Sequence, residues 1–350
     1  MKPTQQLFDL LGGREVAELD FLAVVNEANA RLVTPRLFTV LQSTGRIDDA
    51  PADIVDFLED VFRRNTERNR RLLVNLQAAV VALNAAEITP VLLKGAVQLA
   101  GRGGNCDRIL SDIDLLICPD EVEIGLAAMA AAGITQVSRY PGERVHVVAE
   151  FGDDNSVGLI DLHQRPAGPP GFAEAETLAK SSRPSIGIKG SALTPSLAHQ
   201  ILLLVMHDHF HDGGYWRGEV DLRHLLDMKD AVEVGAPFDT QIVENLCQSA
   251  LMRDAVVLFL TAGREWLGAN VQLRRTSLTD WLNLGRADLH SRSGLLSQGL
   301  SLAWPALQFT RVHSHRRAVK RASLRIGLGQ EPLRVADRLK RMRQIYAPNG

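Results

Sequence analysis

The sequence predicts an α+β fold in which a mixed sheet lies between two helical regions. Apolar residues recur at spacings of three and four in the first part of the chain, as in FLAVVNEANARL, and this periodicity returns after about residue 190. Between these parts lie short alternating apolar stretches that are typical of strands. We therefore expect an N-terminal helical region, a sheet module, a helical domain and a basic C-terminal helical tail, over residues 1–87, 88–190, 191–310 and 311–350.

Length and composition fit a globular protein of about two domains. The formal net charge is −2, yet the segment Arg311–Arg343 is strongly basic, so the remainder is correspondingly acidic. Three cysteines, Cys106, Cys118 and Cys247, are too few for a disulfide framework or a four-ligand zinc site, which favours a reducing compartment. The first residues lack a signal-peptide pattern and no apolar run reaches membrane-spanning length, so we expect a cytoplasmic protein without a transmembrane segment.

The first helical region ends in a long helix with the sequence IVDFLEDVFRRNTERNRRLLVNLQAAVVALNAA. Its middle, Arg63–Arg71, is polar nearly all round and is expected to be a solvated face. Contact between its arginines and a phosphate-bearing ligand is the alternative.

The sheet module opens with a buried strand over Val91–Leu93, a turn at Lys94-Gly95 and a helix over Ala96–Ala100. A second strand is predicted over Ile109–Ile117. Because strand side chains alternate between the two faces, the two aspartates of this strand are expected on one face and its apolar residues on the other. Two carboxylates on one face repel each other, which is tolerable only with a cation, a proton or a basic partner between them.

The rest of the module reads as one helix, three strands and a short helix. These are predicted over Val122–Ala132, closed by Gly133, then Thr135–Arg139, Val145–Phe151, Val157–His163 and Phe172–Lys180. The third of these strands, ending in GLIDLH, repeats the alternation of apolar residue and carboxylate. It places Asp161 on one face, where it could join Asp112 and Asp114.

Three carboxylates at a sheet edge are hard oxygen ligands of the kind that Mg²⁺ prefers. Gly95 at the strand-to-helix turn would let the backbone approach phosphates, and Lys94 and Arg108 would supply positive charge. Ser111 is interpreted as a strand-entry residue that hydrogen-bonds locally rather than as a nucleophile. An Asp-x-Asp pair alone also fits an exposed edge strand, but solubilising charges need neither a Lys-Gly turn nor a third carboxylate.

Together these stretches form one pattern, made of Leu93-Lys94-Gly95, Arg108, Ser111-Asp112-Ile113-Asp114-Leu115-Leu116-Ile117 and Ile160-Asp161-Leu162-His163. The pattern resembles the uncharacterised nucleotidyltransferase family of the polymerase-β-like nucleotidyltransferase superfamily. The resemblance runs from about residue 88 to 230, through a helical segment that carries His207, Trp216, Arg217 and Asp221-Leu222.

The resemblance implies a polymerase-β-like core and a transferase that moves a nucleoside monophosphate from a nucleoside triphosphate, such as ATP, to a hydroxyl acceptor with release of pyrophosphate. It implies that Asp112 and Asp114 bind two Mg²⁺ ions, with Mn²⁺ as the alternative. Asp161 would be the third metal-binding carboxylate, placed to deprotonate the acceptor or to orient its metal. The implied nucleotide- and phosphate-binding residues are Lys94, Gly95, Arg108 and Ser111. Many relatives in the superfamily carry Gly-Ser where this chain has Lys-Gly.

A histidine-rich segment lies in the helical domain. On a helix His207 and His211 are four apart on one face, a metal-capable spacing, and His199 lies two turns earlier. We favour packing and hydrogen bonding at the seam with the sheet module. Contact with the substrate, for which His163 is also a candidate, and a separate metal site are the alternatives.

Trp216 and Arg217 precede the helix that begins near Asp221. Trp216 could stack on a base and Arg217 could contact phosphate, although packing is favoured for an aromatic residue at a helix junction. Asp221 is expected to cap or pair within the fold, and stays a candidate substrate contact.

The C-terminal tail interleaves basic and apolar residues at loosely helical spacing. A solvated helix that packs on the acidic remainder is favoured, and contact with RNA phosphates or an anionic membrane surface is the alternative. The basic residues are Arg311, Arg316, Arg317, Lys320, Arg321, Arg325, Arg334, Arg338, Lys340, Arg341 and Arg343.

The acceptor is left open among a small molecule, a protein and tRNA. Three other functions stay open. The first is a toxin-like nucleotidyltransferase that modifies tRNA, which would use the basic tail. The second is a non-catalytic nucleotide sensor or assembly factor that retained the fold. The third is a histidine-rich, metal-dependent phosphohydrolase.

Overall fold

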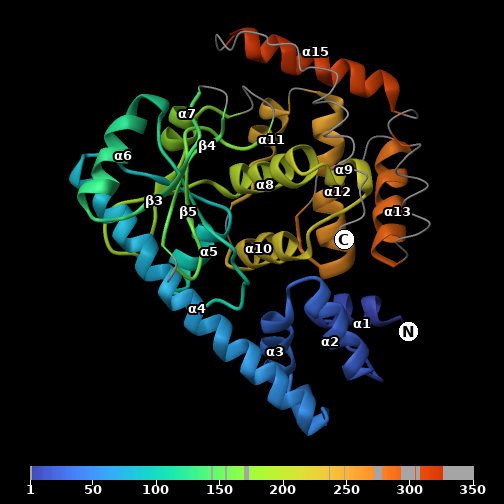
Figure 1. Ribbon diagram of the computed structural model, residues 1–350. Helices are drawn as coiled ribbons and strands as arrows, with labels where there is room; N and C mark the ends of the chain where they lie inside the picture. Colours follow the sequence, from blue (N-terminus) through green and yellow to red (C-terminus); the bar gives the residue numbers. More distant parts are fainter. Residues whose placement is uncertain are drawn as a thin grey trace.

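The computed structural model describes residues 2–142, 145–153, 156–168, 173–235, 237–247, 249–271, 278–292, 304 and 308–325. It confirms the predicted α+β class, with one mixed sheet flanked by helices (Figure 1). The predicted tail beyond Arg325 lies outside the described residues. The helices before the sheet are α1 (Pro3–Leu11), α2 (Phe21–Ala30), α3 (Thr34–Ser43), the short 3₁₀ helix η1 (Arg46–Asp49) and α4 (Ala52–Ala85).

The sheet has seven strands in the order β3-β4-β5-β2-β1-β7-β6. Their bounds are β1 Val91–Leu93, β2 Ile113–Leu116, β3 Gln136–Arg139, β4 Val147–Phe151, β5 Ile160–His163, β6 Arg183–Pro184 and β7 Leu193–Thr194. Pairs β2–β5 and β1–β7 are parallel and the other pairs are antiparallel. The helices between the strands are α5 (Gly95–Gly101), the 3₁₀ helix η2 (Pro119–Glu121), α6 (Val122–Ala131) and α7 (Ala175–Lys180).

Strand β2 begins four residues later than the predicted Ile109, because the chain before it is bound by α4 instead of by another strand. Asn69 donates from its side-chain amide to the carbonyl oxygens of Cys106 and Arg108, at 2.9 Å each. Arg68 donates to the carbonyl oxygen of Leu110. The polar middle of α4 is therefore not a fully solvated face as predicted, since the Asn69 side chain is buried against this segment.

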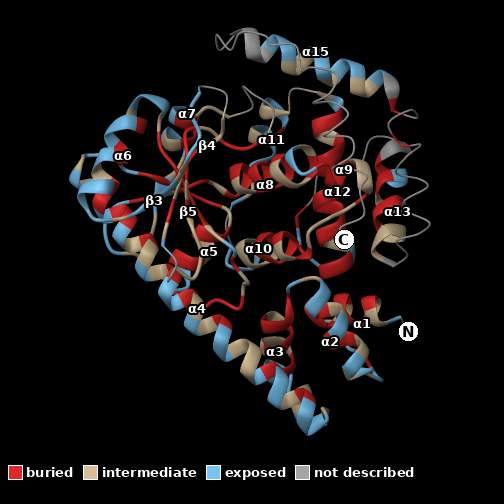
Figure 2. Ribbon diagram, in the orientation of Figure 1, coloured by how far each residue is buried: buried red, intermediate tan, exposed pale blue. Residues whose placement is uncertain are grey.

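The two faces of the sheet pack against different sets of helices, as Figures 1 and 2 show. Ile113 and Leu115 of β2 belong to the core formed with α4, α5 and α6. Leu116, on the opposite face, belongs to the larger core built from the helical domain. Because alternate residues share a face, Asp114 lies on the side of the helical domain, as its spacing predicted.

The helical domain continues from α8 (Leu197–Val205) into a π-helical turn, η3 (Met206–His211), followed by helices α9 to α13 and α15. Their bounds are α9 Gly214–Arg217, α10 Leu222–Glu233, α11 Thr240–Leu246, α12 Ala250–Leu267, α13 Leu278–Arg292 and α15 Phe309–Arg325. The N-terminal helices share the core of this domain, and the ring of Phe8 stacks on that of Trp266 with centroids 4.9 Å apart. None of the helices within the described ranges combines the length and apolarity that a membrane crossing needs.

Candidate active site

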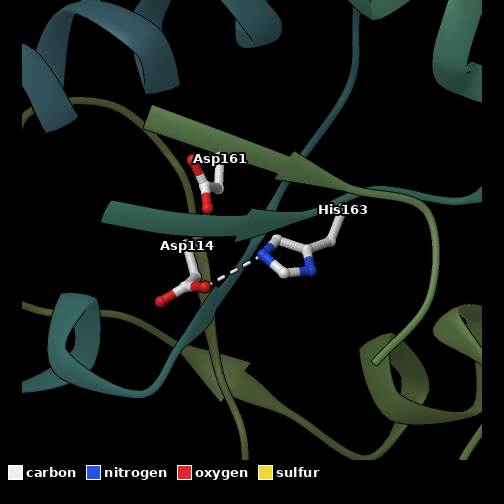
Figure 3. Close-up of side chains that lie close together, drawn as sticks. All are labelled: Asp114, Asp161 and His163. Atoms are coloured by element: carbon white, nitrogen blue, oxygen red, sulfur yellow. Dashed lines mark hydrogen bonds and ion pairs between the residues drawn. The ribbon is translucent and has the colours of Figure 1, made fainter. Parts of the chain in front are cut away.

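The carboxylates of Asp114 and Asp161 lie side by side because of the register between β2 and β5. These strands are parallel neighbours in which Asp114 is paired with Asp161 and Leu116 with His163. Paired residues on adjacent strands project from the same face of the sheet. Figure 3 shows the Asp114, Asp161 and His163 side chains gathered on that face.

Asp114 is a buried carboxylate held by two cationic or polar partners. The ammonium group of Lys94 and Nε2 of His163 each lie 2.9 Å from its Oδ1 atom. Burial alone would raise the pKa of Asp114, but the charge of Lys94 and the contact with His163 hold it well below its usual range. Asp114 is therefore ionised at neutral pH. The same pairing raises the pKa of Lys94 although burial opposes it.

Asp161 has the opposite electrostatic character. Burial, then the neighbouring charges of Asp114 and Asp112, raise the pKa of Asp161 to about 7. A carboxylate in this position is stabilised by a proton or by a cation. Asp114, Asp161 and His163 each offer one ligand atom, and these atoms lie within 4.8 Å of one another. Two carboxylates that repel each other at this separation fit a hard divalent cation such as Mg²⁺.

Asp112 lies just before β2 and is half-buried. Its Oδ1 atom accepts a hydrogen bond from the hydroxyl of Ser111 at 2.9 Å. The charge of Asp112 contributes to the raised pKa values of Lys94 and Asp161. The charge of Asp112 therefore affects the pKa values of this cluster. The three ligand atoms that lie within 4.8 Å of one another belong to Asp114, Asp161 and His163, and not to Asp112.

Lys94 occupies the turn between β1 and α5 in a strained backbone conformation. Its φ of +46° and ψ of −123° are unfavourable for any residue except glycine, and such strain costs about 1–3 kcal/mol. The conformation directs Nζ to Asp114. Gly95 follows it, where a Cβ atom would lie 2.2 Å from Cδ2 of Leu110. The turn thus needs glycine at position 95 for packing and strains the residue at 94.

A family model described as uncharacterised nucleotidyltransferase matches residues 17–268. The chain belongs to this family. The resemblance found in the sequence is thereby confirmed, and the protein is a transferase enzyme of the nucleotidyltransferase class. A search of curated proteins finds no match. One solved structure, the antibiotic-resistance factor ANT(2'')-Ia in solution, is 14% identical with a TM-score of 0.35, and the similarity covers 50% of this chain and 88% of that chain.

Arg108 of this nucleotidyltransferase pairs with a residue of the helical domain. Its Nε atom lies 3.1 Å from both carboxylate oxygens of Asp227 on α10, and Nη1 donates to the carbonyl oxygen of Ile109 at 2.8 Å. The side chains of Arg108 and Asp227 are 9% and 8% exposed. The pair ties the segment before β2 to α10.

The histidine-rich segment reaches the carboxylate cluster through a row of imidazole rings. The ring of His146 lies 5.6 Å from that of His163 and 4.6 Å from that of His211, which in turn lies 5.6 Å from that of His207. Burial, then the charges of His163 and His211, lower the pKa of His146 to about 3. His146 was not singled out from the sequence, because it follows a loop and has no motif of its own.

The remaining candidates make contacts within the helical domain. Trp216 packs on the core beside Tyr215, with ring centroids 5.1 Å apart. Arg217 donates to the carbonyl oxygen of Asp212 at 2.8 Å. Asp221 caps α10 by accepting from the backbone N–H of Arg223 at 2.8 Å, and also pairs with its guanidinium group. The structure therefore gives these three side chains intramolecular partners.

His163 belongs to the same predicted strand as Asp161, and in the structure it contacts Asp114. It lies two residues after Asp161 on β5, so both project from the same face, and its side chain is 2% exposed. Its contact with Asp114 makes it a positioning residue for that carboxylate. Its Nδ1 atom is buried without a hydrogen-bond partner among the described residues.

Proposed function

We propose that this nucleotidyltransferase transfers a nucleoside monophosphate from a nucleoside triphosphate to a hydroxyl group of an acceptor, with release of pyrophosphate. The observation that carries the proposal is the register of β2 and β5, which sets Asp114 directly beside Asp161 on the face that Lys94 also reaches. Membership of the family supports the transfer of nucleotides in general.

The carboxylates of Asp112, Asp114 and Asp161 would hold two Mg²⁺ ions, with Mn²⁺ as the alternative. Bound there, the ions would offset the charge of the triphosphate and of the oxygen that attacks the α-phosphorus. The oxygen-rich donor set and the mutual repulsion of its members support this assignment.

Asp161 is proposed to accept the proton of the acceptor hydroxyl. A general base must lie beside the proton that it accepts, and Asp161 lies next to Asp114 on the face where the acceptor would bind. Lys94 would keep Asp114 ionised and place a fixed positive charge beside the phosphates. The chemistry then depends on position and charge, so a covalent nucleophile is unnecessary.

Lys94, Gly95 and Ser111 are proposed phosphate contacts because they lie at the turn and at the strand entry beside the carboxylates. Arg108 stays in this proposed set, although it would have to exchange Asp227 for a phosphate. Five residues of the helical domain are proposed to contact the base or the acceptor, namely His207, His211, Trp216, Arg217 and Asp221.

A tRNA acceptor is the second candidate, and one observation favours it. The ring of His315 on α15 stacks on that of Phe210 in the π-helical turn, with centroids 5.1 Å apart. The same helix exposes Arg316, Arg317 and Lys320. A basic face would thus be fixed beside the histidine-rich segment, where it could contact RNA phosphates. For an RNA acceptor, labelling is expected to fall steeply with salt, to be abolished by Arg316→Glu/Arg317→Glu and to be lost after treatment with ribonuclease.

The proposal is tested by incubating the full chain with each nucleoside triphosphate labelled at the α-phosphate, Mg²⁺ and a cell extract. Label is expected to move to one class of acceptor, in amounts equal to the pyrophosphate released. Asp114→Asn and Asp161→Asn should each abolish transfer, and Asp56→Asn, which changes an exposed carboxylate on α4, should leave it intact.

Two other outcomes would each support a different function. Nucleotide binding with neither transfer nor pyrophosphate would indicate a non-catalytic sensor or assembly factor. Release of inorganic phosphate that survives Asp114→Asn and is lost in His207→Gln would indicate the histidine-centred phosphohydrolase. Either result would contradict the proposed transfer.

A further inference from the structure

The π-helical turn η3 brings together side chains that a regular helix would separate. The backbone N–H of Asp212 donates to the carbonyl oxygen of His207 at 2.9 Å, a bond that spans five residues. Residues five apart therefore lie one above the other here, and single π turns of this kind occur frequently at functional sites. The turn places His207, Asp208 and Asp212 in one group, in which each offers a ligand atom within 4.8 Å of the others.

The two distances from His207 to the carboxylates of this group match the spacing of ligands around a metal ion. Nδ1 of His207 lies 3.1 Å from Oδ1 of Asp208 and 3.3 Å from Oδ2 of Asp212. Tetrahedral zinc has bonds of about 2.0–2.1 Å to nitrogen and oxygen, so its ligand atoms lie about 3.3 Å apart. One imidazole nitrogen of this group therefore contacts two carboxylates at distances close to those between the ligands of a tetrahedral ion.

The other oxygen of Asp208 is fixed by a neighbouring helix. Nδ1 of His224 on α10 lies 2.6 Å from Oδ2 of Asp208, and the two side chains are 8% and 11% exposed. A carboxylate that is oriented by a hydrogen bond with a second residue is typical of metal ligands.

We propose that His207, Asp208 and Asp212 bind one divalent transition-metal ion, with Zn²⁺ as the best fit, at a site separate from Asp114 and Asp161. A site with an imidazole ligand favours Zn²⁺ over Mg²⁺, which prefers oxygen ligands such as the carboxylates of Asp112, Asp114 and Asp161. Three protein ligands leave a fourth position for water or for an oxygen of a substrate. The row of imidazoles from His207 to His163 joins this site to the carboxylate cluster.

The site is tested by titrating the metal-free full chain with Zn²⁺ by calorimetry and with Co²⁺ by visible absorption, both in excess Mg²⁺. The wild type is expected to bind about one equivalent and to give the intense visible bands of four-coordinate Co²⁺. His207→Gln and Asp212→Asn should weaken binding at least tenfold, and His224→Gln should weaken it about 10–100-fold because it removes the partner that orients Asp208. Asp56→Asn is the matched control and should bind as the wild type does.

A double variant, Asp114→Asn/Asp161→Asn, separates this site from the proposed catalytic one. It should retain the Co²⁺ bands and the Zn²⁺ affinity, whether or not nucleotide transfer is ever observed. Asp212→Asn should fold, since the Asp212 side chain is 49% exposed, and circular dichroism checks this. Absence of binding by the wild type, unchanged affinity in Asp212→Asn, or bands lost only in the double variant would overturn the proposal.

Discussion

Asp161→Asn is expected to stabilise the metal-free protein at alkaline pH, although it removes a side chain of the candidate active site. The pKa of Asp161 is about 7 in the folded protein against an ordinary 3.8. A difference of this size corresponds to at most about 4 kcal/mol in the free energy of unfolding, and solvent screening of this partly buried group reduces it to about 1–2 kcal/mol.

The direction follows from proton linkage. The folded state holds the proton of Asp161 more tightly than the unfolded state, so ionisation lowers the stability of the wild type as pH rises from about 4 to 7. Below this window the protonated carboxyl resembles the asparagine amide. The free energy of unfolding of Asp161→Asn therefore exceeds that of the wild type only slightly in acid, and the difference reaches its full size above about pH 7.

The assay is urea denaturation of the wild type and the variant at about pH 5 and pH 8, since most of the effect develops between these values. Saturating Mg²⁺ should reverse the order at pH 8, because an ion that binds only the folded wild type raises its free energy of unfolding. Asp56→Asn should show neither effect. A variant that is less stable than the wild type at pH 8 without Mg²⁺ would refute the account of the carboxylate repulsion.

Three further variants test how the site is supported. Lys94→Gly should be more stable than Lys94→Ala by about 1 kcal/mol in urea, because only glycine accepts the φ of +46°, and equal stabilities would count against backbone strain. Asn69→Ala should lower the free energy of unfolding by about 1–3 kcal/mol, since two buried carbonyl oxygens lose their donor, and an unchanged urea midpoint would contradict this. Arg108→Ala should lower the free energy of unfolding by about 3–5 kcal/mol, because it leaves Asp227 buried and unpaired. The double variant Arg108→Ala/Asp227→Ala should lose less than Arg108→Ala does. If the losses of the two single variants simply add in the double variant, the two residues are not a coupled pair.

The local pattern of the sequence predicted strands β1 to β5 of the sheet module, and it missed the two-residue strands β6 and β7. The apolar run Val91–Leu93 forms β1 with the predicted bounds, and alternation put Asp114 on the opposite face from Ile113 and Leu115. The start of β2 was placed too early, because the sequence does not reveal that Asn69 takes up the carbonyl oxygens of the preceding segment. The periodicity of a sequence shows which residues are apolar. It does not show which polar side chains will hydrogen-bond to the backbone of another segment.

The contacts that define the site are long-range and depend on strand order. Alternation placed Asp161 on a face, and only the parallel pairing of β2 with β5 sets it beside Asp114. The same holds for His146, which lies just before β4 and contacts His163 on β5 and His211 in the helical domain. A π turn has the same apolar spacing as an α-helix over so few residues, so its grouping of His207 with Asp212 was not predictable.

The most direct test of the proposed transfer is the fate of the three phosphates of a nucleoside triphosphate turned over by the purified chain with its acceptor. Nucleotidyl transfer predicts that the α-phosphate becomes attached to the acceptor while the β- and γ-phosphates leave together as pyrophosphate, and that Asp114→Asn stops both. Transfer of the γ-phosphate, release of inorganic phosphate alone, or turnover unchanged in Asp114→Asn would contradict it.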